Sequence, residues 1–215
     1  MNERFTDRAQ AGRLLADKLK RYANHPSTVV LGIPRGGVPV AYQVARELHL
    51  PMDIFVVRKL GVPAQPELAM GAVADGGAYY LNNEVVSQIQ ISDQEIQDVL
   101  RREECELERR ERLYRQGRAA LPLTGQTVIL VDDGVATGSS VRAAIRVLQL
   151  QKPSSIILAV PVAPADTCES LRGEVDRLVC LESPDPFHAV GAWYKDFSPT
   201  SDQEVTRLLK EAAAG

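Results

Sequence analysis

Two adjacent carboxylates stand directly before a loop of small and hydroxyl-bearing residues. Asp132 and Asp133 follow the apolar run 128–131, and residues 134–140 read Gly-Val-Ala-Thr-Gly-Ser-Ser. From Val141 onward the apolar residues recur at helical spacing, so the loop is expected to end at a helix N-terminus. Unpaired backbone N–H groups and the positive end of the helix dipole make such a terminus an anion site.

This arrangement predicts a ligand that is held in two ways. A phosphate would sit on the loop, whereas Asp132 and Asp133 repel phosphate and would instead accept hydrogen bonds from vicinal hydroxyls or hold a magnesium ion. A sugar phosphate satisfies both demands. The alternative is an α/β protein that uses Asp-Asp as an ordinary turn before a helix. The predicted phosphate-binding residues are Ala136, Thr137, Gly138, Ser139 and Ser140.

Two further polar stretches follow predicted strands. The strand predicted over residues 28–33 ends in Pro-Arg-Gly-Gly, where the Arg35 guanidinium lies beside the bare amides of Gly36 and Gly37, a combination that suits pyrophosphate. The strand predicted over 52–57 ends in Arg58 and Lys59, at the edge where open α/β sheets bind ligands. Taken alone, the first could be a tight turn and the second a solvated pair of cations.

Residues 128–140, VILVDDGVATGSS, resemble the signature of the type I phosphoribosyltransferases. The resemblance implies that 5-phosphoribosyl 1-pyrophosphate (PRPP) is the donor, with its ribose hydroxyls on Asp132 and Asp133 and its 5′-phosphate on residues 136–140. It also implies that pyrophosphate is held by Arg35, Gly36, Gly37, Arg58 and Lys59, with a non-proline cis peptide near Arg35-Gly36. One departure is Gly134, where the family prefers an aliphatic residue or Ser.

The activity implied is magnesium-dependent transfer of the phosphoribosyl group to a nitrogenous base with release of pyrophosphate, as in nucleotide salvage. Magnesium would bind mainly through the donor, with Asp132 and Asp133 as further candidate ligands. Ala136 stands where the hypoxanthine and guanine branch of the family has an aspartate, which disfavours 6-oxopurines as acceptors. A PRPP-binding regulator with the same fold and no turnover is the second hypothesis.

An aromatic cluster lies near the C-terminus. Four of the aromatic residues fall between 187 and 197, and a stacked base would suit such a surface. We therefore interpret Val135, Phe187, Trp193 and Tyr194 as a candidate base pocket. The alternative is a small core under the C-terminal helix predicted over 201–213, because aromatic residues are most often buried.

The elements that position these residues alternate between strand and helix. This order predicts an α/β fold with a doubly wound, mostly parallel sheet and a small hood or flexible-loop region. Helices are expected over 6–22 and over 92–118, where Ser92 and Glu95 have capping-box spacing. Residues 61–71, which contain two prolines, are expected to form a mobile loop near the site, with Glu67 as its only acidic residue.

Length and composition indicate one domain over 1–215. The resemblance implies that this domain is phosphoribosyltransferase-like, with a core at about 28–165 and a C-terminal hood and helix over 166–215 on the acceptor side. The net charge of −3 argues against nucleic-acid or membrane partners, and three unpaired-looking cysteines without a signal sequence indicate the cytoplasm. The helix over 92–118 is dense in both charge signs and is a candidate subunit contact, which leaves a homodimer open.

Overall fold

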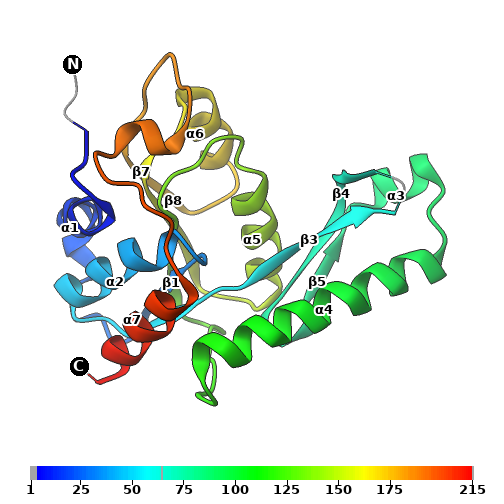
Figure 1. Cartoon of the computed structure of the whole chain (residues 1–215), viewed down its shortest axis with the longest axis horizontal. Coiled ribbons are helices and arrows are strands. Elements are labelled where there is room, and N and C mark those ends of the chain that lie inside the picture. Colours follow the sequence, from blue (N-terminus) through cyan, green and yellow to red (C-terminus); the bar gives the residue numbers. More distant parts are fainter. Residues whose placement is uncertain (1–3, 64, 215) are drawn as a thin grey trace.

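The computed structural model describes residues 4–63 and 65–214, and its centre is a five-stranded parallel sheet (Figure 1). The strand order is β2-β1-β6-β7-β8, and every neighbouring pair is parallel. The strands are β1 (Thr28–Gly32), β2 (Met52–Ile54), β6 (Thr127–Val131), β7 (Ser155–Val162) and β8 (Arg177–Glu182). The predicted doubly wound α/β fold is therefore confirmed.

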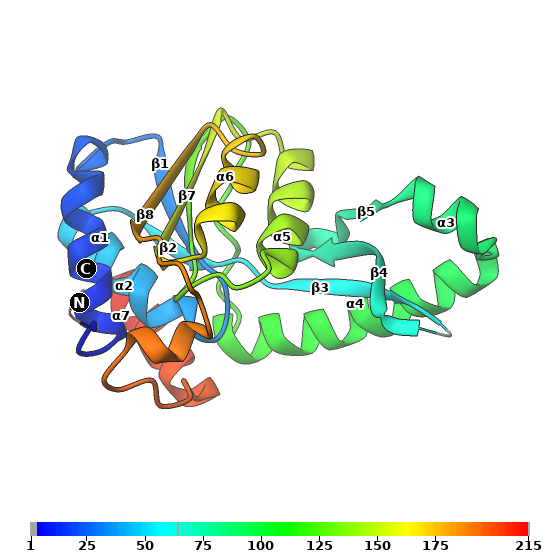
Figure 2. The ribbon, with the colours of Figure 1, turned by 90° about the horizontal axis from the view of Figure 1, so that it is seen from above.

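Helices cover both faces of this sheet (Figure 2). Val30 and Ile129 point into a core shared with α1 (Arg8–Leu19), α2 (Gly37–Leu48) and α7 (Asp202–Ala214). The adjacent residues of the same strands, among them Leu31 and Leu130, point into a second core with α5 (Ser139–Leu150) and α6 (Ala165–Arg172). Successive side chains of a strand alternate between faces, so continuous apolar strands feed both cores.

A second, antiparallel sheet forms an arm that extends from this body (Figure 1). It contains β3 (Val57–Val62), β4 (Gln65–Ala74) and β5 (Tyr79–Leu81), with a 3-10 turn over Asp75–Gly77. The helix α3 (Asn83–Ile89) follows, and α4 (Asp93–Arg115) runs back along the arm to contact α7. The capping box of α4 is present as predicted, but the helix ends at Arg115, three residues earlier than expected.

The sequence predicts a mobile loop over 61–71, and of this range residue 64 lies outside the described residues. Residues 61–62 and 65–71 are instead in strands β3 and β4 of a hairpin. A Cβ on Gly61 would lie 2.6 Å from the carbonyl oxygen of Pro66, and one on Gly71 would overlap the carbonyl oxygen of Tyr80. The register shifts on either side of Gly61, which marks a bulge in the ladder. The two glycines therefore allow close approach of strands, and Glu67 lies exposed on β4.

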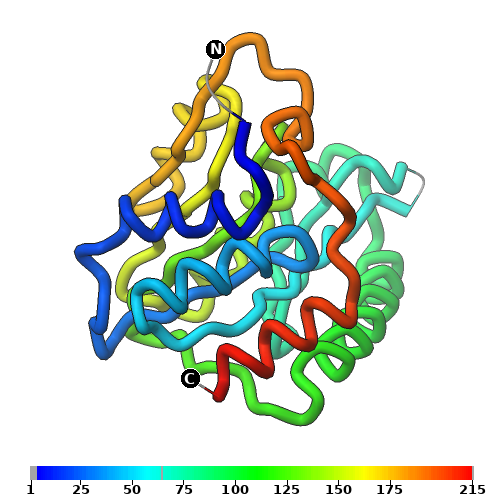
Figure 3. Tube along the Cα trace, turned by 60° about the vertical axis from the view of Figure 1, so that its left-hand side comes forward, coloured from blue at the N-terminus to red at the C-terminus, as the bar shows by residue number. Residues whose placement is uncertain are grey.

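The start of the chain is paired with a segment near its end. Phe5 forms a parallel bridge with Tyr194, and the amides of Lys195 and Asp196 donate to the carbonyls of Phe5 and Thr6 at 2.7 and 2.9 Å. We call residues 184–200 the closing segment; it includes a 3-10 turn over Val190–Trp193. Figure 3 shows it passing beside the N-terminal stretch that leads into α1. No described helix is both long and apolar enough to span a bilayer.

A buried charge cluster joins α4 to both sheets. The Arg115 guanidinium contacts the carboxylates of Asp53, at 3.1 Å, and Asp75, and donates to the carbonyl oxygen of Ile54 at 3.1 Å. The side chains of Arg115, Asp53 and Asp75 are all less than one-tenth exposed. Burial raises the pKa of Asp75 to about 8, although the nearby Arg115 charge acts in the opposite direction.

We predict that Arg115→Met lowers the free energy of unfolding by about 3–5 kcal/mol, because two buried carboxylates lose their counter-charge. The loss should be larger at pH 9 than at pH 6, since Asp75, whose pKa burial raises to about 8, is protonated at the lower pH and then carries no unpaired charge. Urea unfolding at both pH values measures it. Arg112→Met is the matched control: its ion pair with Glu108 is exposed, and its unfolding curve should overlay that of the unmodified protein. Equal curves for the two variants would contradict the buried cluster.

Candidate functional site

The loop between β6 and α5 presents an exposed run of small residues. Ala136, Thr137, Ser139 and Ser140 are exposed or lie at the start of the helix, and Gly138 caps α5 in the left-handed conformation with φ 78°. Glycine suits that backbone position because it has no Cβ to clash. The predicted phosphate-binding residues thus form one continuous stretch at the start of the helix.

Side chains from outside the loop donate hydrogen bonds to its carbonyl groups. The Thr167 hydroxyl donates to the carbonyl oxygen of Ala136 at 3.0 Å, and Arg142 Nη1 donates to that of Thr137 at 2.8 Å. Arg142 is itself held by Glu174 and Ser170, at 2.8 and 2.7 Å. The sequence-based prediction missed Arg142 and Thr167, because neither lies within the motif.

The amide groups of the same loop have few partners. Across the described residues, the amides of Thr137, Gly138 and Ser140 make no backbone hydrogen bond outside the helices and strands, and Ser139 N lies 3.5 Å from the Thr137 hydroxyl. A helix start with unpaired N–H groups attracts anions through these donors and through the helix dipole. The geometry is that of an anion site open to solvent.

The carboxylate pair lies between this loop and three other segments. Asp133 Oδ2 accepts a 2.8 Å hydrogen bond from Arg8 Nε, and the Asp133 carbonyl oxygen accepts one of 2.6 Å from the Tyr194 hydroxyl. The Asp133 amide donates to Asp132 Oδ1 at 2.9 Å. Arg8 was missed by the sequence analysis, because 125 residues separate it from its partner.

Burial and mutual repulsion control the charge on this pair. The pKa of Asp132 is raised well above its ordinary value by burial and then by the Asp133 charge. Burial also raises the pKa of Asp133, while the hydrogen bond and charge of Arg8 act to lower it. Burial likewise raises the pKa of the Tyr194 hydroxyl, which stays protonated and able to donate. The site therefore favours ligands that bring hydroxyl donors or positive charge to the two carboxylates.

The glycine loop after β1 packs directly on the carboxylates. A Cβ on Gly36 would lie 2.6 Å from Asp133 Cγ, and one on Gly37 would lie 2.6 Å from the Val131 carbonyl oxygen. A cis peptide bond joins Pro34 to Arg35, one residue before the expected position. The structure therefore brings the predicted pyrophosphate loop against the predicted ribose site.

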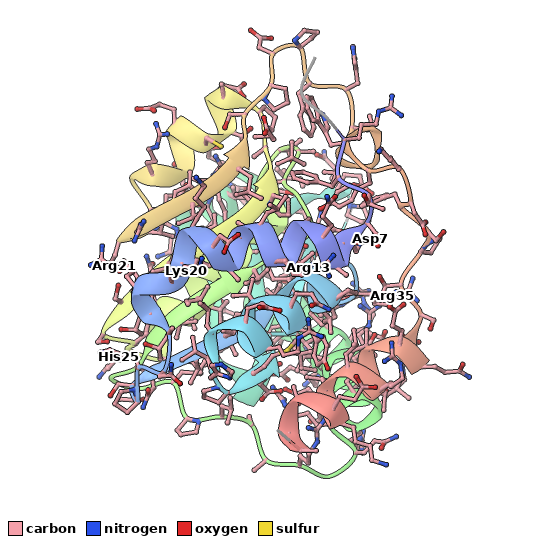
Figure 4. The ribbon with its side chains drawn as sticks, turned by 90° about the vertical axis from the view of Figure 1, so that its left-hand side faces the viewer. Asp7, Arg13, Lys20, Arg21, His25 and Arg35 are labelled. Carbon is pink, nitrogen blue, oxygen red and sulfur yellow. The ribbon has the colours of Figure 1, made fainter. Side chains whose placement is uncertain are left out.

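Arg35 itself remains accessible. Its side chain is about half exposed and lies 3.7 Å from the carboxylate of Asp202, at the start of α7. Figure 4 shows Arg35 at the same end of the α1–α2 pair as Asp7, the N-cap of α1. The guanidinium is thus at the end of the body where the glycine loop lies.

Arg58 and Lys59 have a different setting from the predicted one. They do not end a strand of the parallel sheet, because β2 stops at Ile54 and both residues lie within β3 of the arm. Arg58 donates to Glu103 of α4 at 2.7 and 2.9 Å, whereas Lys59 is exposed. Their role towards pyrophosphate remains a prediction.

Three of the four candidate base-pocket residues, Phe187, Trp193 and Tyr194, belong to one small apolar cluster, whereas Val135 belongs to the core shared with α5 and α6. Val135 is buried, and its amide donates to Val162 O at 2.9 Å. Tyr194 is also buried, with ring centroids 5.4 Å from Phe5 and 5.0 Å from Phe197. Phe187 and Trp193 are partly buried against the same cluster. These aromatic residues pack on the N-terminal segment, and not under the C-terminal helix as the alternative prediction had placed them.

Gly134, the departure from the family pattern, has a packing explanation. A Cβ there would overlap Cγ1 of Val190 in the closing segment, and the second-nearest atom would be Val162 Cγ1 at 3.1 Å. A larger residue would therefore push the closing segment away from the carboxylates. The described residues include no group of three or more His, Cys, Asp or Glu residues that could hold a metal ion.

Comparison with known proteins gives consistent matches. The family model described as "Phosphoribosyl transferase domain" matches residues 2–196. Proteins from two strains of Mycobacterium tuberculosis, whose names assign them provisionally as phosphoribosyl transferases, are 45% identical over 208 residues, covering 97% of this chain and 47% of their own length. The chain thus spans about half of these relatives. The crystal structure of TT1426 from Thermus thermophilus is 41% identical, covers 97% of this chain and 98% of that one, and superimposes with a TM-score of 0.86.

We predict that Gly36→Ala lowers the free energy of unfolding by about 1–3 kcal/mol, because the added methyl group overlaps the Asp133 carboxylate and must displace it. Thermal and urea unfolding measure the loss. Gly173→Ala is the matched control, since its Cβ would meet no atom closer than 3.9 Å and its φ of −76° suits alanine. If Gly36→Ala were as stable as the control, the two loops would not be in the contact described.

Proposed function

Because this chain belongs to the type I phosphoribosyltransferase family, we propose that it transfers the phosphoribosyl group of PRPP to a nitrogenous base and releases pyrophosphate. One observation carries the proposal: an exposed helix start with unpaired amides directly follows two carboxylates, and a glycine loop with an accessible guanidinium packs against them. This arrangement offers separate places for a phosphate, for sugar hydroxyls and for pyrophosphate.

The donor would be bound from both ends. The amides and hydroxyls of residues 136–140 would hold the 5′-phosphate, whose binding energy fixes the sugar for reaction. Arg35 and the amides of Gly36 and Gly37 would receive the pyrophosphate. Asp132 and Asp133 would accept the ribose hydroxyls between these two anchors.

The same carboxylates would act on the reaction itself. As the bond from the anomeric carbon to the pyrophosphate oxygen breaks and the bond to the acceptor nitrogen forms, positive charge develops on the sugar. Two carboxylates beside the ring stabilise that charge more in the transition state than in the ground state. Burial raises the pKa of both carboxyl groups, and the developing positive charge favours their ionised forms.

A magnesium ion would be coordinated by oxygen atoms of both the protein and PRPP. The chain offers Asp132 and Asp133, and the remaining oxygen ligands would come from PRPP. When bound, the ion would neutralise charge on the departing pyrophosphate.

The acceptor would be a nitrogenous base other than the 6-oxopurines recognised through an aspartate at position 136, since Ala136 has no carboxylate there. The deciding experiment measures pyrophosphate release from PRPP and magnesium with a panel of purines, pyrimidines and amines. Turnover with one of them establishes the transferase. Tight PRPP binding without turnover for any acceptor would instead favour a PRPP-binding regulator.

We predict that Asp132→Asn and Asp133→Asn each lower the rate of pyrophosphate release by about 100-fold, the cost typical of losing one electrostatic contact to a transition state. Steady-state assays with the best acceptor measure the change. Asp17→Asn on the exposed side of α1 is the control and should retain full activity. Unchanged rates in both aspartate variants would remove the pair from the mechanism.

A second prediction concerns the metal ion. Chelation with EDTA should abolish pyrophosphate release, because the charge on the departing group is then left without its counter-ion, and added magnesium chloride should restore the rate. The assay is the same one, run with PRPP and acceptor at saturation. Full activity in EDTA would contradict the dependence on magnesium.

A further inference from the structure

Arg8 connects three parts of the chain through one side chain. It is the first residue of α1, and its side chain is only 11% exposed. Its Nε donates to Asp133 Oδ2 at 2.8 Å and its Nη1 donates to the Ser198 carbonyl oxygen at 2.8 Å. The guanidinium carbon lies 3.9 Å from the centre of the Phe197 ring. A single planar cation thus joins α1, the carboxylate loop and the closing segment.

Local preferences do not explain this residue. A positive charge at the start of a helix is disfavoured by the helix dipole, and burial of a guanidinium costs free energy unless its donors are paired. The contacts that offset these costs are all distant in sequence. The guanidinium carbon lies over the Phe197 ring, and N–H groups of the same guanidinium donate to Asp133 and Ser198.

Contacts from three other segments hold Asp133 in place. Arg8 holds Oδ2, the Tyr194 hydroxyl holds the carbonyl oxygen, and Gly36 packs against the carboxylate with no room for a side chain. Loss of Arg8 would remove the cation that is hydrogen-bonded to this carboxylate and leave the repulsion from Asp132 in place. A carboxylate accepts about four hydrogen bonds, so Arg8 leaves acceptor sites for sugar hydroxyls.

We propose that Arg8 is a positioning residue of the donor site. It orients the Asp133 carboxylate towards the ribose hydroxyls, and this orientation depends on the position of the closing segment. The inference rests on the proposed function, since it assumes that PRPP is the ligand. Arg8 acts through Asp133 and the closing segment, and does not itself contact the donor.

The test measures the dissociation constant of PRPP with magnesium by isothermal titration calorimetry. Arg8→Met should weaken binding by about 10- to 100-fold, the range typical when the outer partner of a ligating group is lost. Arg8→Lys, which keeps the charge but not the planar fork, should fall between Arg8→Met and the unmodified protein. Arg13→Met is the control: Arg13 lies on the exposed side of α1 (Figure 4), and its dissociation constant should not change.

A double-mutant cycle separates positioning from general stability. In an Asp133→Asn background, Arg8→Met should change the dissociation constant by less than about threefold, because its target has already been altered. Thermal unfolding of each variant is recorded in parallel. If Arg8→Met does not fold, Arg8→Gln, which keeps an amide donor, takes its place in the cycle with the same expected outcomes.

Two results would overturn the inference. One is a dissociation constant for Arg8→Met equal to that of the unmodified protein, with or without a lower unfolding temperature. The other is the same loss of affinity in the Asp133→Asn background as in the native one. Absence of PRPP binding by the unmodified protein is a different outcome, and it would refute the proposed function from which the inference starts.

Discussion

The close contact between the loops after β1 and β6 is the constraint on which the site depends. The two strands are parallel neighbours, and the Ile33 amide donates to the Val131 carbonyl oxygen at 2.9 Å, so both loops leave the sheet at the same edge. Gly36 and Gly37 then lie against the carboxylate pair with no space for a Cβ. A side chain at either position would push the glycine loop, which carries Arg35, away from the carboxylates. The two halves of the candidate donor site would then be separated.

Buried and half-buried arginines pair with carboxylates on other elements of the chain. Arg8 ties α1 to Asp133, Arg58 ties the arm to Glu103, and Arg115 joins the end of α4 to Asp53 and Asp75. In each case the guanidinium is paired with carboxylates that are themselves largely buried. Pairing of this kind does little to stabilise a fold relative to apolar packing, but losing one partner is costly, so it specifies which elements meet.

The closing segment joins the N-terminal stretch before α1 to the carboxylate loop. Phe5 and Tyr194 pair through backbone and ring contacts, and the Tyr194 hydroxyl reaches the Asp133 backbone. Because Gly134 leaves room for Val190, this segment sits directly on the carboxylate loop. The aromatic residues that the sequence suggested as a base pocket therefore belong to one cluster, in which Tyr194 is buried and donates to the carboxylate loop.

Local patterns in the sequence determined the strands, the helices and the order of the motif. The run 128–131, the two carboxylates and the small residues after them predict strand, loop and helix because each depends on near neighbours only. The tertiary structure alone decided the rest. It placed residues 61–62 and 65–71 in paired strands, because Gly61 and Gly71 permit a close strand approach that spacing does not reveal. It also brought Arg8, Thr167 and Tyr194 to the loop, since contacts across tens of residues depend on packing and leave no local periodicity to read.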